Sequence, residues 1–326
     1  THNLPPQEGE TRGTFDIAEY LKGRAAGNYT IFMRSVDDSA QQIYLSSSYT
    51  KAINIEKLGI PVLSVVNGML NYTKVYSAVE YEIGIKKPSE TQPTIYKNRK
   101  DVTTFEFGTQ FTAGEYYISI TALGNGSSTF SSETSEDFTI EKLRTPIAST
   151  AERADLEVKN GQLYWKAVEN ATLYSIYVYR YDALAQKYIL SYGTQLQPKE
   201  ENWYLPTGER GTYQVSISVK GDDTKYVDSD VYVYNKALKK LNAPNDLGVL
   251  EGKVSWMNNA DAVNGYELIV NDTYIAVGGT NTFELNENFS AINYTIRVRS
   301  VGNNDATLTS DASDPISASK LEKVVM

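Results

Sequence analysis

The chain has 326 residues, of which 41% are hydrophobic, and its formal net charge is -9. This length is enough for about two to four domains. The hydrophobic content is enough for packed cores and argues against wholesale disorder. The acidic balance argues against nucleic acid as a partner, and the absence of cysteine excludes disulfides and thiolate chemistry.

The first 57 residues predict a polar lead-in followed by half of a β-sandwich module. Residues 1–13 are polar, a short strand is expected at Thr14–Ile17, and an alternating strand starts at Tyr29. A further strand is expected from Tyr44 to Tyr49 and on to Ile55. Because 13 polar residues cannot supply the front strands of a sandwich, only the C-terminal half of this module is expected.

A Lys-Leu-x-x-Pro motif divides the rest of the chain. It occurs at 57–61, 142–146 and 240–244, and Lys320-Leu321 begins a fourth copy. Proline lacks an N–H and favours extended backbone before it, so it suits the start of an edge strand. The motif therefore predicts module borders, with modules at 58–142, 143–240 and 241–326.

The strands within each module recur in the same order. A large aromatic lies four residues after a glycine, at Tyr72, Trp165 and Trp256. A tyrosine then opens an alternating strand, at Tyr81, Tyr174 and Tyr266, and a short strand follows around Phe105, Trp203 and Phe283. The last alternating strand opens with Tyr29, Tyr116, Tyr213 or Tyr294, at intervals of 87, 97 and 81 residues. Short alternating strands without a helical stripe predict an all-β fold of repeated sandwiches.

These residues resemble the fibronectin type III module, an Ig-like β-sandwich, over residues 58–320. The resemblance implies that the last recurring tyrosine forms a tyrosine corner, its hydroxyl bonded to nearby backbone. Tyr72 departs from the pattern, since the other two modules carry tryptophan there. The expected structural core residues are Tyr29, Tyr72, Tyr81, Tyr116, Trp165, Tyr174, Tyr213, Trp256, Tyr266 and Tyr294. The style of the repeat is similar to tandem modules of bacterial surface and secreted proteins.

One set of aromatics is expected to face outward. On the strand from Tyr174, inward positions alternate with Tyr177, Tyr179 and Tyr181. If the next-to-last strand lies beside it, Gln214, Ser216 and Ser218 flank these rings. Such a strip suits stacking on a sugar or packing on a partner protein, although a plain tyrosine-rich surface is the simpler interpretation.

The sequence contains few residues suited to catalysis or metal binding. The single histidine, His2, lies in the polar tail, so Ser-His-Asp catalysis and multi-histidine metal sites are excluded. Acidic clusters at Asp37-Asp38, at 222–230 and at 303–305 are interpreted as solvated hairpin tips, since no twelve-residue calcium loop is present. No enzyme activity, cofactor or metal is therefore expected.

The sequence predicts a non-catalytic extracellular array that spaces, displays or attaches other domains at a bacterial cell surface. Its partners would be other domains or proteins there, with no transmembrane segment in this chain. Two alternatives remain open. One is a carbohydrate-binding accessory region of a larger protein, using the outward tyrosines. The other is a filament or virion component whose half module is completed by strand addition.

Overall fold

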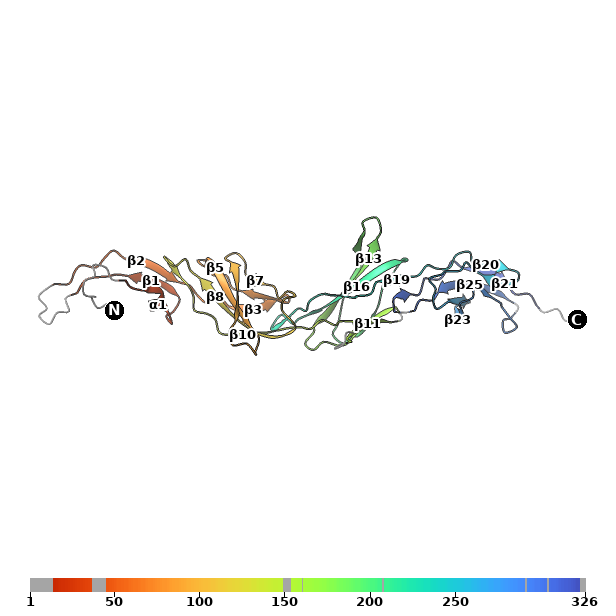
Figure 1. Cartoon of the computed structure of the whole chain (residues 1–326), viewed down its shortest axis with the longest axis horizontal. Coiled ribbons are helices and arrows are strands. Elements are labelled where there is room, and N and C mark those ends of the chain that lie inside the picture. The colour runs from red at the N-terminus through yellow and green to blue at the C-terminus, as the bar shows by residue number, and fades with distance from the viewer. Residues whose placement is uncertain are drawn as a thin grey trace. The chain divides into compact units, whose positions relative to one another are not determined.

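The computed structural model describes residues 14–36, 45–148, 154–159, 161–206, 208–290, 292–303 and 305–322. Apart from one five-residue helix, the described elements are β-strands, which confirms the all-β class (Figure 1). The chain divides into two compact units, each described by itself below. The first comprises Thr1–Leu143 with Gly221–Asp228, and the second comprises Arg144–Lys220 with Ser229–Met326.

The first unit begins with a single small sheet. β1 (Gly27–Ile31) and β2 (Ile53–Lys57) pair antiparallel in this sheet, and β9 (Thr129–Phe130) pairs parallel with β2. The helix α1 (Ile17–Leu21) precedes β1. The strand predicted at Thr14–Ile17 is wrong, because Asp16 caps a helix there by accepting a 3.0 Å hydrogen bond from the Glu19 N–H. Residues 45–49 also form no strand. The Ser47 hydroxyl instead accepts from the Ser35 N–H, so a side chain replaces the ladder bond.

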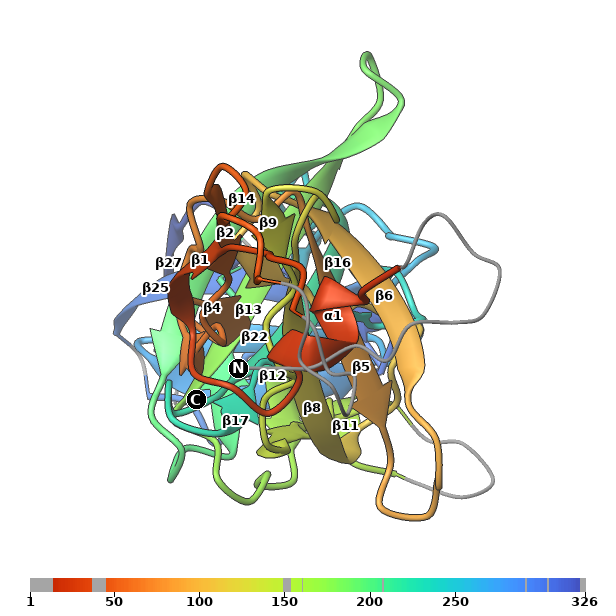
Figure 2. The same ribbon diagram turned by 90° about the vertical axis from the view of Figure 1, so that its left-hand side faces the viewer.

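A two-sheet sandwich follows in the first unit. One sheet has the order β3-β4-β7 and the other β17-β10-β8-β5-β6, with β5, β6 and β8 side by side in Figure 2. Alternate residues of β8 point into the core, as its period of two predicts. The strands of the two sheets are β3 (Leu63–Val66), β4 (Met69–Tyr72), β5 (Glu80–Lys86), β6 (Thr94–Arg99), β7 (Thr104–Phe105), β8 (Gly114–Leu123), β10 (Phe138–Lys142) and β17 (Tyr226–Val227).

The second unit holds two sandwiches of the same kind. The first pairs a β11-β12-β15 sheet with a sheet built on β14-β13-β16-β19-β26, to which β18 adds at β16. Its strands are β11 (Leu156–Lys159), β12 (Gln162–Trp165), β13 (Leu173–Asp182), β14 (Lys187–Leu196), β15 (Asn202–Tyr204), β16 (Gly211–Lys220), β18 (Tyr232–Val233) and β19 (Leu238–Lys240).

The last sandwich has sheets ordered β20-β21-β24 and β23-β22-β25-β27. Its strands are β20 (Gly248–Leu250), β21 (Lys253–Ser255), β22 (Tyr266–Val270), β23 (Thr273–Gly278), β24 (Thr282–Phe283), β25 (Asn293–Ser300), β26 (Thr307–Leu308) and β27 (Ile316–Ser319). Of these, β26 does not pair within its own sandwich but with β19.

An aromatic pair lies at the centre of each complete sandwich. The ring centroids are 4.8 Å apart for Tyr72 and Tyr81 and 5.3 Å apart for Trp165 and Tyr174. They are 5.4 Å apart for Trp256 and Tyr266. All six side chains are buried. Each pair joins one sheet to the other, so these rings hold the two layers together through contact area and edge-to-face geometry.

A tyrosine corner recurs at the start of the last long strand in every copy. The Tyr29, Tyr116, Tyr213 and Tyr294 hydroxyls each donate to the carbonyl four residues upstream, at Ala25, Thr112, Glu209 and Ser290. Three of these tyrosines are buried. Tyr29, which was expected in a core, is only half-buried, because no second sheet covers β1 among the described residues.

Candidate functional site

The outward tyrosines lie on β13 of the second unit, where the β13–β14 hairpin extends beyond β16 (Figure 1). Tyr177 and Tyr181 are 37% and 42% exposed, and Tyr179 is half-buried. On β14, Tyr188 pairs with Tyr181 and Leu190 with Tyr179. We call these five residues the tyrosine face.

The tyrosine face is uncharged and partly pre-arranged. The Tyr181 and Tyr188 rings meet edge to face with centroids 5.3 Å apart. Tyr177 lies against Gly193, where a Cβ atom would come within 2.8 Å of the ring. Glycine at this position therefore lets the Tyr177 ring lie close to the sheet. Rings held in this way offer aromatic surface at low conformational cost.

The neighbouring strand differs in part from expectation. The register places Ser216 beside Tyr177 and Gln214 beside Tyr179, as predicted, whereas Ser218 lies beside Ser175 and flanks no tyrosine. Ser216 and Ser218 are buried, so neither serine adds to the exposed surface beside the tyrosines. Ser216 lies between Tyr177 and Val233, and these larger side chains flank the small one.

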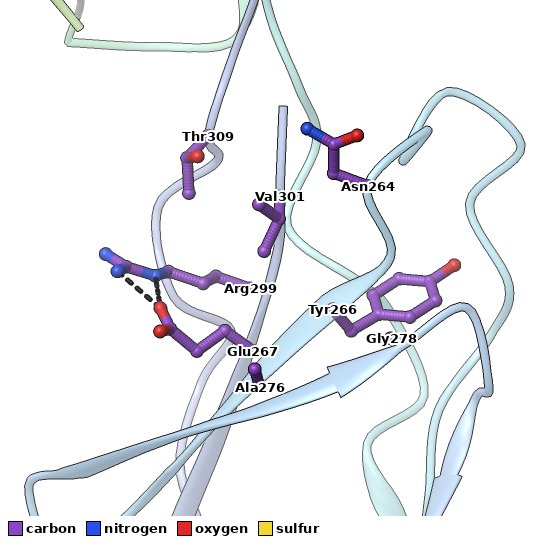
Figure 3. Close-up of a pocket in the computed structure, with 8 residues that line it drawn as sticks. All are labelled: Asn264, Tyr266, Glu267, Ala276, Gly278, Arg299, Val301 and Thr309. Carbon is purple, nitrogen blue, oxygen red and sulfur yellow. Dashed lines mark hydrogen bonds and ion pairs between the residues drawn. The ribbon is translucent and has the colours of Figure 1, made fainter. Parts of the chain in front are cut away.

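A shallow pocket of about 450 Å³ lies on the last sandwich (Figure 3). It is lined by residues of β22, β23 and β25 and by Asn264, Val301 and Thr309 outside these strands, and its charged groups are Glu267 and Arg299. The Arg299 Nε and Nη2 atoms are 2.6 and 2.5 Å from the Glu267 carboxylate, and the guanidinium lies 4.8 Å from the Tyr274 ring centroid. The two charged groups of the pocket therefore pair with each other.

The acidic and amide residues in the hairpin tips shape the loops. Asn125, Asp222 and Asn303 occupy equivalent places, and the side-chain oxygen of each accepts backbone N–H groups from the next turn. Partial burial raises the pKa of Asp222, but the hydrogen bonds from Thr224, Tyr226 and Lys225 outweigh it and lower the pKa to about 2.

Within the described residues, no three His, Asp or Glu side chains gather in a way that could hold a metal ion. Asp37, Asp38 and Asn304, which belong to the predicted hairpin tips, lie outside the described residues. No helix in the described part is long and apolar enough to cross a membrane.

The lysine of the Lys-Leu motif has a role that the sequence interpretation missed. Lys57, Lys142 and Lys240 are 3%, 1% and 6% exposed. Their ammonium groups donate to backbone carbonyls five and eight residues before the corner tyrosine, with five of these bonds at Leu21, Arg24, Gly108, Phe111 and Gly208. A buried ammonium needs such partners, so the lysine fastens the last strand of its copy to the turn before the tyrosine corner.

A recurring segment of the following copy pairs with the strand end that carries each Lys-Leu motif. Residues 124–133, 221–230 and 302–311 share a Gly-Asx start, an apolar residue six places later and Ser-Asp or Ser-Glu at the end. We call these segments bridge loops. Within the first unit, β9 and β17 pair parallel with the ends of β2 and β10, and within the second unit β26 pairs parallel with the end of β19.

We call the contact between a Lys-Leu motif and the bridge loop of the next copy a joint. In the joints at Lys57 and Lys240, both the leucine and the lysine of the motif bond to the bridge loop. Leu58 and Leu241 donate their N–H groups to Phe130 and Leu308 at 2.9 and 3.1 Å. Glu133 Oε1 lies 2.5 Å from the Lys57 Nζ, and Asp311 Oδ1 lies 2.8 Å from that of Lys240. The repeated Gly-Asx…Ser-acid pattern was the signal in the sequence that could have revealed this joint.

Comparisons with known proteins carry no argument about the fold or function of this chain. No family model matches the chain, and no curated protein matches it. Among solved structures, the FN1–FN3 domains of chicken CNTN1 align with 82% of this chain and 98% of that one. The aligned residues are 13% identical and the TM-score is 0.26, so this likeness carries no functional inference.

Proposed function

We propose that this chain is a non-catalytic extracellular array of β-sandwich modules that spaces or displays other domains at a bacterial cell surface. The supporting observation is the repeated joint, in which a buried lysine and leucine of one copy meet the bridge loop of the next. Joints of this kind limit bending between neighbouring modules, which is what a spacer requires.

A distance measurement across one joint tests this proposal. Spin labels are introduced at the exposed Ser191 and Glu287, and labelling is specific because the chain has no cysteine. Pulsed electron resonance should give a narrow distribution of label distances. Leu308→Asp, which places a charge at a position that is 3% exposed, should broaden it.

The matched control is Leu321→Asp, the same change at a leucine that is 85% exposed, which should leave the distribution narrow. A broad distribution in the unaltered protein would overturn the spacer proposal.

A second candidate function is carbohydrate binding, favoured by the uncharged tyrosine face. Tyr177 and Tyr181 expose enough ring to stack on a sugar, and Tyr188 extends the same surface. A glycan array with the unaltered chain, followed by affinity electrophoresis, would detect such binding. The Tyr177→Ala, Tyr179→Ala, Tyr181→Ala triple variant should lose it, whereas Tyr76→Ala, at a tyrosine 90% exposed elsewhere, should keep it. No bound glycan at millimolar concentration would end this alternative.

Assembly by strand addition is supported by the open first sheet. Phe32, Met33 and Ile53 are 54%, 52% and 50% exposed, and in the described residues β1 pairs only with β2. A strand from another chain could extend this sheet. Sedimentation should then reveal oligomers that Phe32→Asp dissociates, and a monomer at tens of micromolar would contradict this alternative.

A further inference from the structure

The fourth Lys-Leu copy lies at the end of β27. Its lysine makes the same kind of backbone contacts as the lysines of the three joints. The Lys320 ammonium donates to the carbonyls of Asn286 and Phe289, the latter at 2.7 Å. These carbonyls lie eight and five residues before Tyr294, the positions that Lys57 and Lys142 use before their own corner tyrosines. The last sandwich therefore presents the same arrangement of groups as the strand ends that carry a bridge loop.

Among the described residues, no bridge loop occupies the other half of this joint. β27 forms the edge of its sheet, whereas β2, β10 and β19 each carry a parallel two-residue strand at the equivalent place. Leu321 is 85% exposed, while Leu58, Leu143 and Leu241 are 1%, 2% and 2% exposed. An exposed leucine beside an unpaired strand edge is a surface suited to strand addition.

The three occupied joints define what fits this surface. Each bridge loop starts with a glycine, at 124, 221 and 302, where a Cβ atom would come within 1.8 to 2.3 Å of a carbonyl oxygen across the loop. Its apolar residue accepts a backbone hydrogen bond from the leucine of the motif. In the joints at Lys57 and Lys240, the acid at its end reaches the lysine ammonium.

We propose that Lys320, Leu321 and the edge of β27 form a docking site for the bridge loop of a further module of this pattern. The occupied joints are the argument, since the same lysine, leucine and strand end bind the same loop each time. A second copy of this chain is not the expected occupant, because its own three bridge strands are each paired with β2, β10 or β19. This inference goes beyond the spacer function and does not depend on what the array displays.

Hydrogen exchange on an extended chain tests the proposal. Residues 322–326 are replaced by a second copy of 242–326, so that Leu321 runs directly into an added module. The amides of Ser319 and Leu321 should then exchange at least about tenfold more slowly than in the unextended chain. In a matched control, the added module carries aspartate and lysine at its equivalents of Leu308 and Asp311, and both amides should return to fast exchange.

Equal exchange of these two amides in both extended chains would overturn the proposal, provided that the central strands of the added module are protected. A second measurement covers the case in which the added module does not fold. A labelled peptide of residues 122–135, cyclised through a disulfide between cysteines added at its two ends, is titrated into the full chain and followed by fluorescence anisotropy. Binding should weaken at least about tenfold with Leu321→Asp. No binding at millimolar peptide, or binding that Leu321→Asp leaves unchanged, would contradict the docking site.

Discussion

The first segment, 14–57, and the two-sheet sandwich of the first unit carry the same two local devices in very different surroundings. Tyr29 and Tyr116 make the same corner bond, yet Tyr29 is half-buried and Tyr116 is 3% exposed. Lys57 and Lys142 are equally buried, although only Lys142 belongs to a complete sandwich. The corner and the lysine are therefore local features of the last two strands and their turn, whereas tyrosine burial requires an opposing sheet.

The largest effect should come from removing an aromatic that only a complete sandwich has. Trp165→Ala should lower the free energy of unfolding of its module by about 3 to 5 kcal/mol, because it leaves a cavity against Tyr174. Chemical denaturation followed by circular dichroism measures this. Tyr204→Ala in the same module, at a side chain 72% exposed, should change stability by less than about 0.5 kcal/mol.

A smaller effect should separate the two tyrosine corners. Tyr116→Phe removes a bond of 2.8 Å to the Thr112 carbonyl and should cost about 1 to 2 kcal/mol of unfolding free energy. Tyr29→Phe should cost less, because water reaches the half-buried corner and can replace the hydroxyl. Equal losses in denaturation of the two variants would show that the surroundings of the corner do not matter.

Acidification should weaken the first joint. The Lys57 ammonium, followed by the Gly23 N–H, lowers the pKa of Glu133 from its ordinary value of 4.5. Because the pKa is depressed in the folded state, the stabilisation is complete above pH 4.5 and is lost as the pH falls through the lower folded-state value. A carboxyl NMR titration should show this shift. Lys57→Met should move the Glu133 pKa back toward 4.5, and an unshifted Glu133 in the unaltered chain would contradict the ion pair.

The smallest effect is expected at a bridge-loop tip. Asp222→Asn should change the unfolding free energy by less than about 0.5 kcal/mol, since asparagine already fills this place at Asn125 and Asn303. Asp222→Ala should cost about 1 kcal/mol, because three backbone N–H groups lose their acceptor. Thermal unfolding monitored at neutral pH distinguishes the two. A destabilised Asp222→Asn would mean that charge, rather than loop geometry, is required.

The main strands of the fold were predictable because they follow simple periodicity. The alternating residues that follow Tyr81, Tyr174 and Tyr266 predicted β5, β13 and β22. The spacing between glycine and Trp165 or Trp256 predicted the preceding strands, β12 and β21. The helix at Ile17–Leu21 was not predicted, because five residues are too few to show a helical period. Its only signal in the sequence is the capping residue Asp16.

The joint was not predicted from the sequence, for a different reason. Lysine is among the residues least often buried, so the Lys-Leu motif was interpreted through its proline. The burial of Lys57 depends on Glu133, which lies 76 residues further along the chain, and no local pattern reports such a contact. The tyrosine face was proposed from alternation alone, but the burial of Ser216 and Ser218 depends on what lies beside them in the folded sheet.

The most direct test of the account compares one residue in four equivalent places by amide hydrogen exchange of the intact chain. Leu58, Leu143 and Leu241 donate to a bridge loop at 2.9, 3.1 and 3.1 Å, so their amides should be strongly protected. Leu321, with the same lysine before it but 85% exposed, should exchange rapidly. Similar exchange at all four leucines would contradict the claim that the bridge loop closes the joint.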